Sequence, residues 1–358
     1  MLNSKLRVVF GFLLASTLGG AFTACAGEDQ CTIAWSHYTG WEPIQYMKDS
    51  GILAKWARRY GVKLDVTSPM DYVESINQYT AGQFCAVAVT NMDALTIPAV
   101  GGVDTTFIVV GDYSNGNDGI LAKAATPFGV KNLAGREVKL VEYTVSHYLL
   151  ARGLEMNGVR LNTVKTVNTS DSDIGALFAT GGKGTVVVTW NPILMTATKV
   201  KDAQLLFDSS KIPGEIIDGI AVRTGVSENV KKAITGAWFE TISIMAEQNS
   251  QRHRDAITRM ANSAGGSEAD FTAQLKTTHL FLSAADAARF TKDAQLKKTM
   301  SFVRNFIFDV GLLRNAKSPD TVGIQFPDGT VLGDAKHVRL RFDTKYMEMA
   351  AAGTLAKK

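Results

Sequence analysis

Residues 31–43 read CTIAWSHYTGWEP, a short apolar run followed by a turn rich in aromatic and polar side chains. The next stretch, IQYMKDSGILAKWARRYG at 44–61, has the apolar spacing of a helix. This strand, turn and helix open a pattern that recurs along the chain, with apolar runs bounded by Gly, Pro and Asp between helix-length amphipathic segments. The pattern predicts a parallel sheet covered by helices on both faces, which is a doubly wound α/β unit.

Two turn-rich breaks divide the chain: YSNGNDG at 113–119 and SSKIPGE at 209–215. The strand and helix pattern restarts after the first break, and a further strand follows the second. From Glu228 onward we predict mostly helix. The expected division is a first lobe of residues 27–117 and 213–358, with the C-terminal helices, and a second lobe of residues 118–212. Two units joined at two points imply a cleft between them.

The N-terminal residues have the anatomy of a secretory signal. Lys5 and Arg7 precede an apolar stretch that starts at Val8, and small residues follow it. A membrane-spanning helix is the alternative, but it needs about 20 apolar residues, and polar GEDQ follows at once. We expect cleavage after Ala26, so that residues 1–26 are a signal peptide. The stretch FTAC also resembles a lipoprotein box and leaves lipidation of Cys25 open.

Cys31 and Cys85 each begin a candidate strand, CTIAW and CAVAV. In an exported chain, disulfides persist, and neighbouring strands would bring the two sulfurs side by side. Two buried free thiols are the equal alternative, because cysteine connectivity cannot be read from sequence.

The chain has 38 Lys and Arg against 34 Asp and Glu, a net charge of +4. The charges are interspersed, and nothing indicates binding to nucleic acid or to an anionic membrane surface.

Open α/β sheets bind ligands beyond the carboxyl ends of their strands. Five stretches follow predicted strands: SHYTGWEP (36–43), TNMDA (90–94), EYTVSH (142–147), TWNP (189–192) and IDG (217–219). Singly, each has a simpler explanation, since Ser, Thr, Asn and Asp after a strand are common helix caps. Helix capping alone therefore stays an alternative for Thr90, Asn91 and Ser146.

The sign of the charge near these strand ends is more informative. The windows 32–47, 85–122, 140–151, 184–198 and 212–222 contain no Lys or Arg. They contain the acidic residues Glu42, Asp93, Asp118, Glu142, Glu215 and Asp218. Helix N-termini make strand-end clefts suitable for anions, whereas carboxylates there disfavour sulfonate, nitrate or phosphate.

Carboxylates and aromatic faces together suit a donor-rich cation such as guanidinium. Trp41 and Trp190, from different lobes, would close on it from opposite sides. The alternative is that Trp41 packs the helix start against the core while Glu42 complements the helix dipole.

Motifs for catalysis are missing. His37 and His147 belong to no HExxH, paired-His or Cys/His pattern, so we predict no metal site and no cofactor. GGKGT at 181–185 lacks the G-K-[ST] ending of a phosphate loop and precedes a strand. No nucleophile elbow or Rossmann glycine fingerprint is present.

The export signal, the two α/β lobes and the helical tail resemble the periplasmic substrate-binding proteins of bacterial ABC importers, type II fold. WSHYTGWEP, GILAKWARRYGVKLDV, YTAGQFCAVAVTNMDAL and VVTWNP are similar to the nitrate/taurine-type group. Within it they resemble the members associated with urea carboxylase and with urea or guanidine.

This resemblance implies a periplasmic Venus-flytrap protein that is not an enzyme. Hinges near 116–122 and 209–216 would close on the ligand, and the closed form would dock on an ABC permease in the inner membrane. We expect a monomer. The proposed ligand-binding residues are Ser36, Tyr38, Trp41, Thr90, Asn91, Asp93, Glu142, Ser146, Trp190 and Asp218. Asp93 and Glu142 would pair with guanidinium, and Asp218 is a third candidate.

Three alternatives remain. Urea or a thiamine-precursor pyrimidine would be the ligand if donors and acceptors are balanced in the cleft. A third reading is an enzyme similar to the fungal pyrimidine synthases that share the fold. The export signal and the lysine-free strand ends speak against that enzyme.

Overall fold

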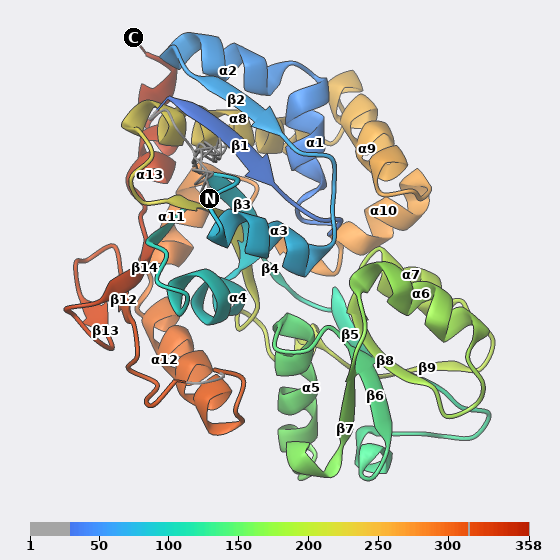
Figure 1. Ribbon diagram of the computed structural model, residues 1–358. Helices are drawn as coiled ribbons and strands as arrows, with labels where there is room; N and C mark the ends of the chain where they lie inside the picture. Colours follow the sequence, from blue (N-terminus) through green and yellow to red (C-terminus); the bar gives the residue numbers. More distant parts are fainter. Residues whose placement is uncertain (1–28, 314–315, 358) are drawn as a thin grey trace, which may run out of the picture.

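The computed structural model describes residues 29–313 and 316–357 (Figure 1). The expected signal peptide and Cys25 lie outside the described residues. Two sheets, one of nine strands and one of five, each pack against helices and form two lobes. The predicted two-lobed, doubly wound α/β fold is confirmed. No helix in the described residues is long and apolar enough to cross a membrane.

The larger sheet holds the first and last parts of the chain. Its order is β13-β12-β14-β4-β10-β3-β1-β2, with β11 beside β4. The strands are β1 (Gln30–Ala34), β2 (Lys63–Val66), β3 (Ala86–Thr90), β4 (Thr105–Ser114), β10 (Ile217–Arg223), β11 (Thr278–Leu280), β12 (Gly323–Gln325), β13 (Val331–Leu332) and β14 (Val338–Phe342). We call this sheet and its helices the large lobe.

The smaller sheet holds the middle of the chain, in the order β7-β6-β8-β5-β9. Its strands are β5 (Asp118–Lys123), β6 (Glu137–Leu140), β7 (Lys165–Asn168), β8 (Val186–Trp190) and β9 (Ala203–Asp208). With its helices it forms the small lobe. The chain crosses between the lobes at 115–117 and at 209–216. The first crossing is shorter than the hinge predicted at 116–122, because β5 already begins at Asp118.

Helices cover both sheets. In the large lobe they are α1 (Glu42–Asp49), α2 (Ile52–Tyr60), α3 (Tyr72–Thr80), α4 (Asn91–Ala94), α8 (Glu228–Ala246), α9 (Gln251–Ser263), α10 (Glu268–Leu275), α11 (Ala284–Lys292), α12 (Ala294–Asp309) and α13 (Lys345–Ala351). In the small lobe they are α5 (Val145–Met156), α6 (Asp171–Thr180) and α7 (Ile193–Thr198). The single helix predicted up to Tyr60 is two helices, because Gly51 adopts a left-handed φ of 76° between them.

Each sheet contains a strand that runs against the parallel set. β10 is antiparallel to β3 and β4, and β5 is antiparallel to β8 and β9. Each sheet is therefore mixed, and the predicted parallel arrangement holds for only part of its strands. The reason is connectivity, since β5 and β10 are the strands that enter one lobe from the other. They consequently begin, and do not end, at the face where the lobes meet.

A disulfide joins Cys31 and Cys85, whose Cα atoms are 5.4 Å apart. β1 and β3 are parallel neighbours, with Ile33 opposite Ala86. The two cysteines therefore lie side by side at the start of adjacent strands, as the disulfide alternative required.

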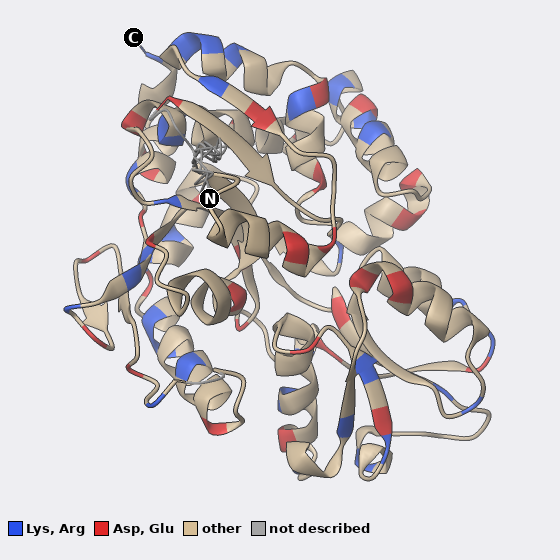
Figure 2. Cartoon of the chain, in the orientation of Figure 1, with Lys and Arg blue, Asp and Glu red and all other residues tan. Residues whose placement is uncertain are grey.

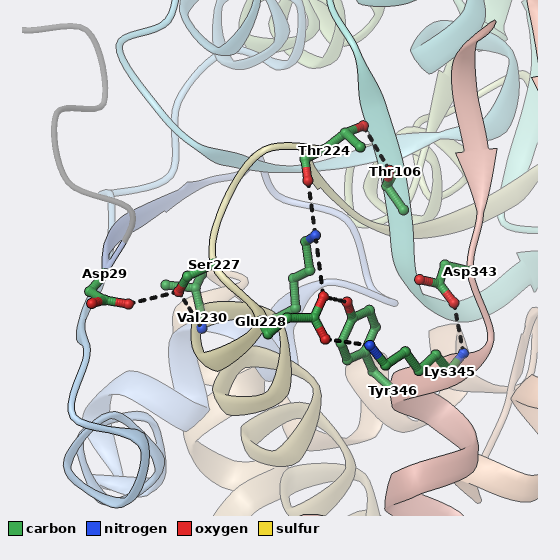
Figure 3. Close-up of polar contacts among 10 residues, drawn as sticks. Asp29, Thr106, Thr224, Ser227, Glu228, Val230, Asp343, Lys345 and Tyr346 are labelled. Atoms are coloured by element: carbon green, nitrogen blue, oxygen red, sulfur yellow. Dashed lines mark hydrogen bonds and ion pairs between the residues drawn. The ribbon is translucent and has the colours of Figure 1, made fainter.

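The C-terminal part was predicted to be mostly helical, but it also supplies four short strands to the large sheet. A polar network ties this part to the N-terminus of α8 (Figure 3). Glu228 accepts a hydrogen bond from Tyr346 Oη at 2.5 Å and forms an ion pair with Lys345. Buried Lys231 donates to Thr224 O at 2.9 Å. The C-terminal strands and helices are thus integral to the large lobe.

Candidate functional site

A small cavity lies between the lobes. Its walls are Tyr38, Trp41, Tyr72, Thr90, Ile216 and Asp218 from the large-lobe side and the crossing segment, with Asp118, Val145 and Trp190 from the small lobe. The volume open to the centre of a water molecule is about 10 Å³, roughly the space of a single water. The closed cavity therefore suits only a very small solute.

Strand register places the polar wall residues. In the large lobe, Asp218 of β10 lies opposite Thr90 of β3 on one side and Asp112 of β4 on the other. In the small lobe, Asp118 of β5 lies opposite Trp190 of β8. Directly opposed residues on antiparallel strands direct their side chains to the same face. Two rows of side chains, one from each sheet, thus meet at the cavity.

Four buried carboxylates gather here, and each is at most 3% exposed: Asp93, Asp112, Asp118 and Asp218. Tyr38 Oη donates to Asp112 Oδ1 at 2.9 Å, and Ser114 Oγ donates to Asp118 Oδ2 at 2.5 Å. Asp93 Oδ2 accepts from Tyr72 Oη at 2.8 Å and from the Val145 amide at 3.2 Å. One oxygen each of Asp93, Asp112 and Asp218 has no hydrogen-bond partner.

No Lys or Arg in the described part of the chain is hydrogen-bonded or ion-paired to these four carboxylates. Lys and Arg lie on other parts of the lobes, whereas the starts of β5 and α6, where the lobes meet, carry acidic residues (Figure 2). Burial raises the pKa of Asp93 to about 6 and the pKa values of Asp112 and Asp118 to about 7. Burial, followed by the charge of Asp112, raises the pKa of Asp218 well above its usual range. The site is therefore a concentration of acidic groups that lacks a counter-charge.

Aromatic rings form the remaining walls. Trp41 lies between Tyr38 and Tyr72, with ring centroids 5.0 Å and 5.5 Å away. Tyr72 in turn meets Trp190 edge-on at 5.5 Å. Trp41 and Trp190 were expected to close on the ligand from opposite sides, and Tyr72 lies in contact with both of them. The faces of aromatic rings next to carboxylates attract cations.

The lobes are in direct contact around the cavity. Trp190 Nε1 donates to His37 O at 3.0 Å, and the Tyr72 amide donates to Asp171 Oδ2 at 3.3 Å. The contact from the Val145 amide to Asp93 also crosses between the lobes. The structure therefore has the closed arrangement of the two lobes.

The structure brings together six of the predicted ligand-binding residues. Tyr38, Trp41, Thr90, Trp190 and Asp218 line the cavity, and Asp93 stands behind Tyr72. Ser36 and Ser146 are also buried, and each has a hydroxyl oxygen with no partner, but neither lines the cavity.

Two predicted ligand-binding residues are placed differently. Asn91 binds the second crossing segment, with its Nδ2 donating to Glu215 O at 3.1 Å and its Oδ1 accepting from the Ile217 amide at 3.0 Å. Glu142 lies outside the cavity lining, because β6 ends at Leu140 and the turn directs the carboxylate to Thr166 Oγ1. Asn91 therefore holds the second crossing segment, and Glu142 holds the neighbouring strand β7.

Glu215 is another acidic residue in the windows without Lys or Arg, but it does not line the cavity. Its carboxylate accepts from Tyr148 Oη at 2.5 Å and from Arg152 Nε at 2.9 Å. It thus ties the crossing segment to α5 in the small lobe and is neutralised by Arg152.

Sequence reasoning did not select Tyr72, Asp112 or Asp118 for the site. Asp112 had a signal, a carboxylate within the buried apolar run TTFIVVGDYS of β4. Asp118 was counted among the acidic residues near the strand ends but was not selected as a ligand-binding residue, because it begins its strand and does not follow one. Tyr72 begins α3 and has no feature in its local sequence that indicates a cavity wall.

The described residues contain no group of three or more His, Cys, Asp or Glu side chains arranged to hold a metal ion. His147, one of the two histidines near the cleft, accepts a hydrogen bond from the Tyr143 amide at 3.2 Å. Burial lowers its pKa to about 4, so it is neutral at physiological pH. His37 Nδ1 is hydrogen-bonded to Glu42 Oε1 at 2.8 Å.

The fold is similar to that of solved periplasmic binding proteins. The alkanesulfonate-binding protein SsuA from Xanthomonas axonopodis pv. citri, bound to MOPS, has a TM-score of 0.65 at 16% identity over 80% of this chain and 95% of its own. SsuA from Escherichia coli has a TM-score of 0.64 at 15% identity over 80% and 94%. The nitrate-binding protein NrtA from Synechocystis PCC 6803 has a TM-score of 0.55 at 10% identity over 90% and 98%.

The sequence matches no protein-family model, and a comparison with curated proteins found no match. At these identities the structural likeness establishes the fold, which is that of a type II periplasmic binding protein, or Venus flytrap.

Proposed function

We propose that the protein is the periplasmic solute-binding component of an ABC importer, and that it captures guanidinium and delivers it to a membrane permease. The fold supports the general role, because the similar solved structures include binding components of importers. In this scheme the crossings at 115–117 and 209–216 are the hinges, and the protein has no catalytic step.

The observation that carries the ligand assignment is the cavity that Asp118 and Asp218 line, with Asp93 and Asp112 behind them and no basic partner among residues 29–313 and 316–357. A sulfonate or nitrate, as named for SsuA and NrtA, would meet these carboxylates as like charges. A small planar cation offers only donors, pairs with carboxylates and stacks on aromatic faces. Guanidinium combines these properties in an ion of only four non-hydrogen atoms. Because it is larger than the single water that the cavity holds, the cavity walls must move apart to admit it.

Isothermal titration calorimetry with guanidinium chloride, urea, taurine and sodium nitrate tests this proposal. We expect saturable binding of guanidinium and no binding of taurine or nitrate. Asp218→Asn should weaken guanidinium binding by about tenfold or more, because it removes a buried charge partner. Glu142→Gln, which changes a carboxylate outside the cavity lining, is the matched control and should bind as the unmodified protein does.

If urea binds more tightly than guanidinium, the importer role stands and the cation is wrong. Binding of taurine or nitrate would contradict the charge argument as a whole.

A further inference from the structure

Asp112 and Asp218 lie opposite each other on neighbouring strands of the large sheet. Their Cα atoms are register partners between β4 and β10, and the two residues are 0% and 1% exposed. Each carboxylate has an oxygen without a partner, and Asp218 lines the cavity. A Cβ added to Gly40 would lie 2.3 Å from Asp112 Oδ2. The backbone of the first turn therefore covers Asp112 closely and keeps water from its Oδ2, whereas Asp218 faces the cavity.

Among the residues that the structure describes, the groups that face this pair are acidic or neutral. Tyr38 donates to Asp112 from the turn before α1, and Thr90 flanks Asp218 on β3. Asp118 on β5 and Asp93 on α4 add further negative charge. Two adjacent carboxylates in such surroundings cannot both ionise without a counter-ion, so they retain a proton.

We propose that Asp112 and Asp218 hold a single proton between them while the cavity is empty, and that this proton leaves to solvent when a cation enters. The inference rests on the proposed function. In the exchange, the carboxylic acid of the pair loses H⁺ to water and becomes a second carboxylate, and the bound cation supplies the compensating positive charge. A neutral solute supplies no such charge and leaves the proton in place, so the pair discriminates between guanidinium and urea.

This exchange makes guanidinium affinity depend on pH. Burial raises the pKa values of both Asp112 and Asp218, so the pair keeps a proton at a pH at which an ordinary carboxyl has lost it, and the ligand must displace this proton. Affinity should therefore rise with pH, by up to about tenfold per unit where a whole proton is released. The dependence should flatten above the range in which the pair titrates.

The test is calorimetric titration of the protein with guanidinium chloride at pH 6, 7 and 8, in phosphate and, at each pH, in a second buffer of higher ionisation enthalpy that holds that pH. The difference in heat between buffers of unlike ionisation enthalpy counts the protons released. We expect a release that approaches about one proton per guanidinium at the lower pH values. Urea, titrated in parallel, should release none.

Asp112→Asn is the informative variant, because an amide imitates the protonated carboxyl and can donate to Asp218. Its guanidinium affinity at pH 6 should stay within about threefold of the unmodified protein, while the rise toward pH 8 and the proton release are lost. Asp309→Asn, which alters an exposed carboxylate on α12, is the matched control and should keep both. A merely structural role for Asp112 would lower affinity equally at every pH.

The outcomes separate the two proposals. Guanidinium binding without proton release overturns the exchange and leaves the proposed function intact. Proton release that persists in Asp112→Asn also overturns it, since Asp118 would then be the source. Absence of guanidinium binding at all three pH values refutes the proposed ligand and the exchange together.

Discussion

Asp93, Asp112 and Asp118 are buried carboxyls whose ordinary pKa is 3.8 and whose pKa in the folded protein is about 6 to 7. Folding therefore favours their protonated form. The stability that they contribute is fully present below the ordinary pKa and is lost as the pH rises through 6 to 7.

We expect the melting temperature of the ligand-free protein to fall by several degrees between pH 5 and pH 8. Guanidinium should restore much of this loss at pH 8, because it neutralises the ionised carboxylates. Differential scanning fluorimetry at both pH values measures the effect. Asp112→Asn should show a smaller difference, and a melting temperature that rises toward pH 8 would contradict the account.

Trp190 offers a second test at a single residue. Trp190→Phe keeps an aromatic wall but removes the hydrogen bond from Nε1 to His37 O, which crosses between the lobes. We expect guanidinium affinity to fall by about two- to tenfold, the range of a single hydrogen bond. Unchanged affinity in calorimetry would show that this bond does not stabilise the closed form.

Residue types in the sequence were sufficient to predict an acidic and aromatic cleft, but they were not sufficient to assign all its members. Trp41, Thr90 and Asp218 were selected because they follow or flank predicted strands. Asp112 and Asp118 depend on register and strand direction, which one sequence does not specify. Glu142 and Asp93 were both selected because they follow a predicted strand. Their roles differ because β6 ends at Leu140, and the turn after it directs the Glu142 carboxylate to Thr166 and away from the cavity.

At the scale of elements, the disulfide links the first and third strands of the large sheet across 54 residues of sequence. A cross-link of this span restricts the unfolded chain and contributes about 2 to 4 kcal/mol in typical cases.

We expect the double variant Cys31→Ser, Cys85→Ser to unfold at a lower urea concentration, with a loss of about 2 to 4 kcal/mol. Guanidinium affinity should be retained, because neither cysteine lines the cavity. Urea denaturation followed by circular dichroism measures the loss. An unchanged midpoint would mean that native packing and not the cross-link holds β1 beside β3.

The existence of most elements was predictable from apolar periodicity, whereas their direction was not. β10 reads as one more apolar strand, and only its arrival from the small lobe makes it antiparallel. The C-terminal strands β12 and β13 have three and two residues, which is too short for periodicity to distinguish them from loops.

For the whole molecule, the closed arrangement predicts a change in shape with ligand. In the proposed mechanism the ligand stabilises contacts such as the Tyr72 amide to Asp171. Small-angle X-ray scattering should give a smaller radius of gyration with saturating guanidinium than without it. Asp218→Asn at the same guanidinium concentration should stay closer to the ligand-free value. Identical radii with and without ligand would contradict closure on binding.

The reversed strands have one further consequence. Asp118 is the first residue of β5, and Asp218 is the second of β10, so each directly follows a crossing between the lobes. One carboxylate belongs to the small sheet and the other to the large sheet. The angle between the lobes therefore sets the distance between the two carboxylates. A solute that is too wide would keep the lobes from closing, so the same two side chains contact the solute and limit the closure of the protein.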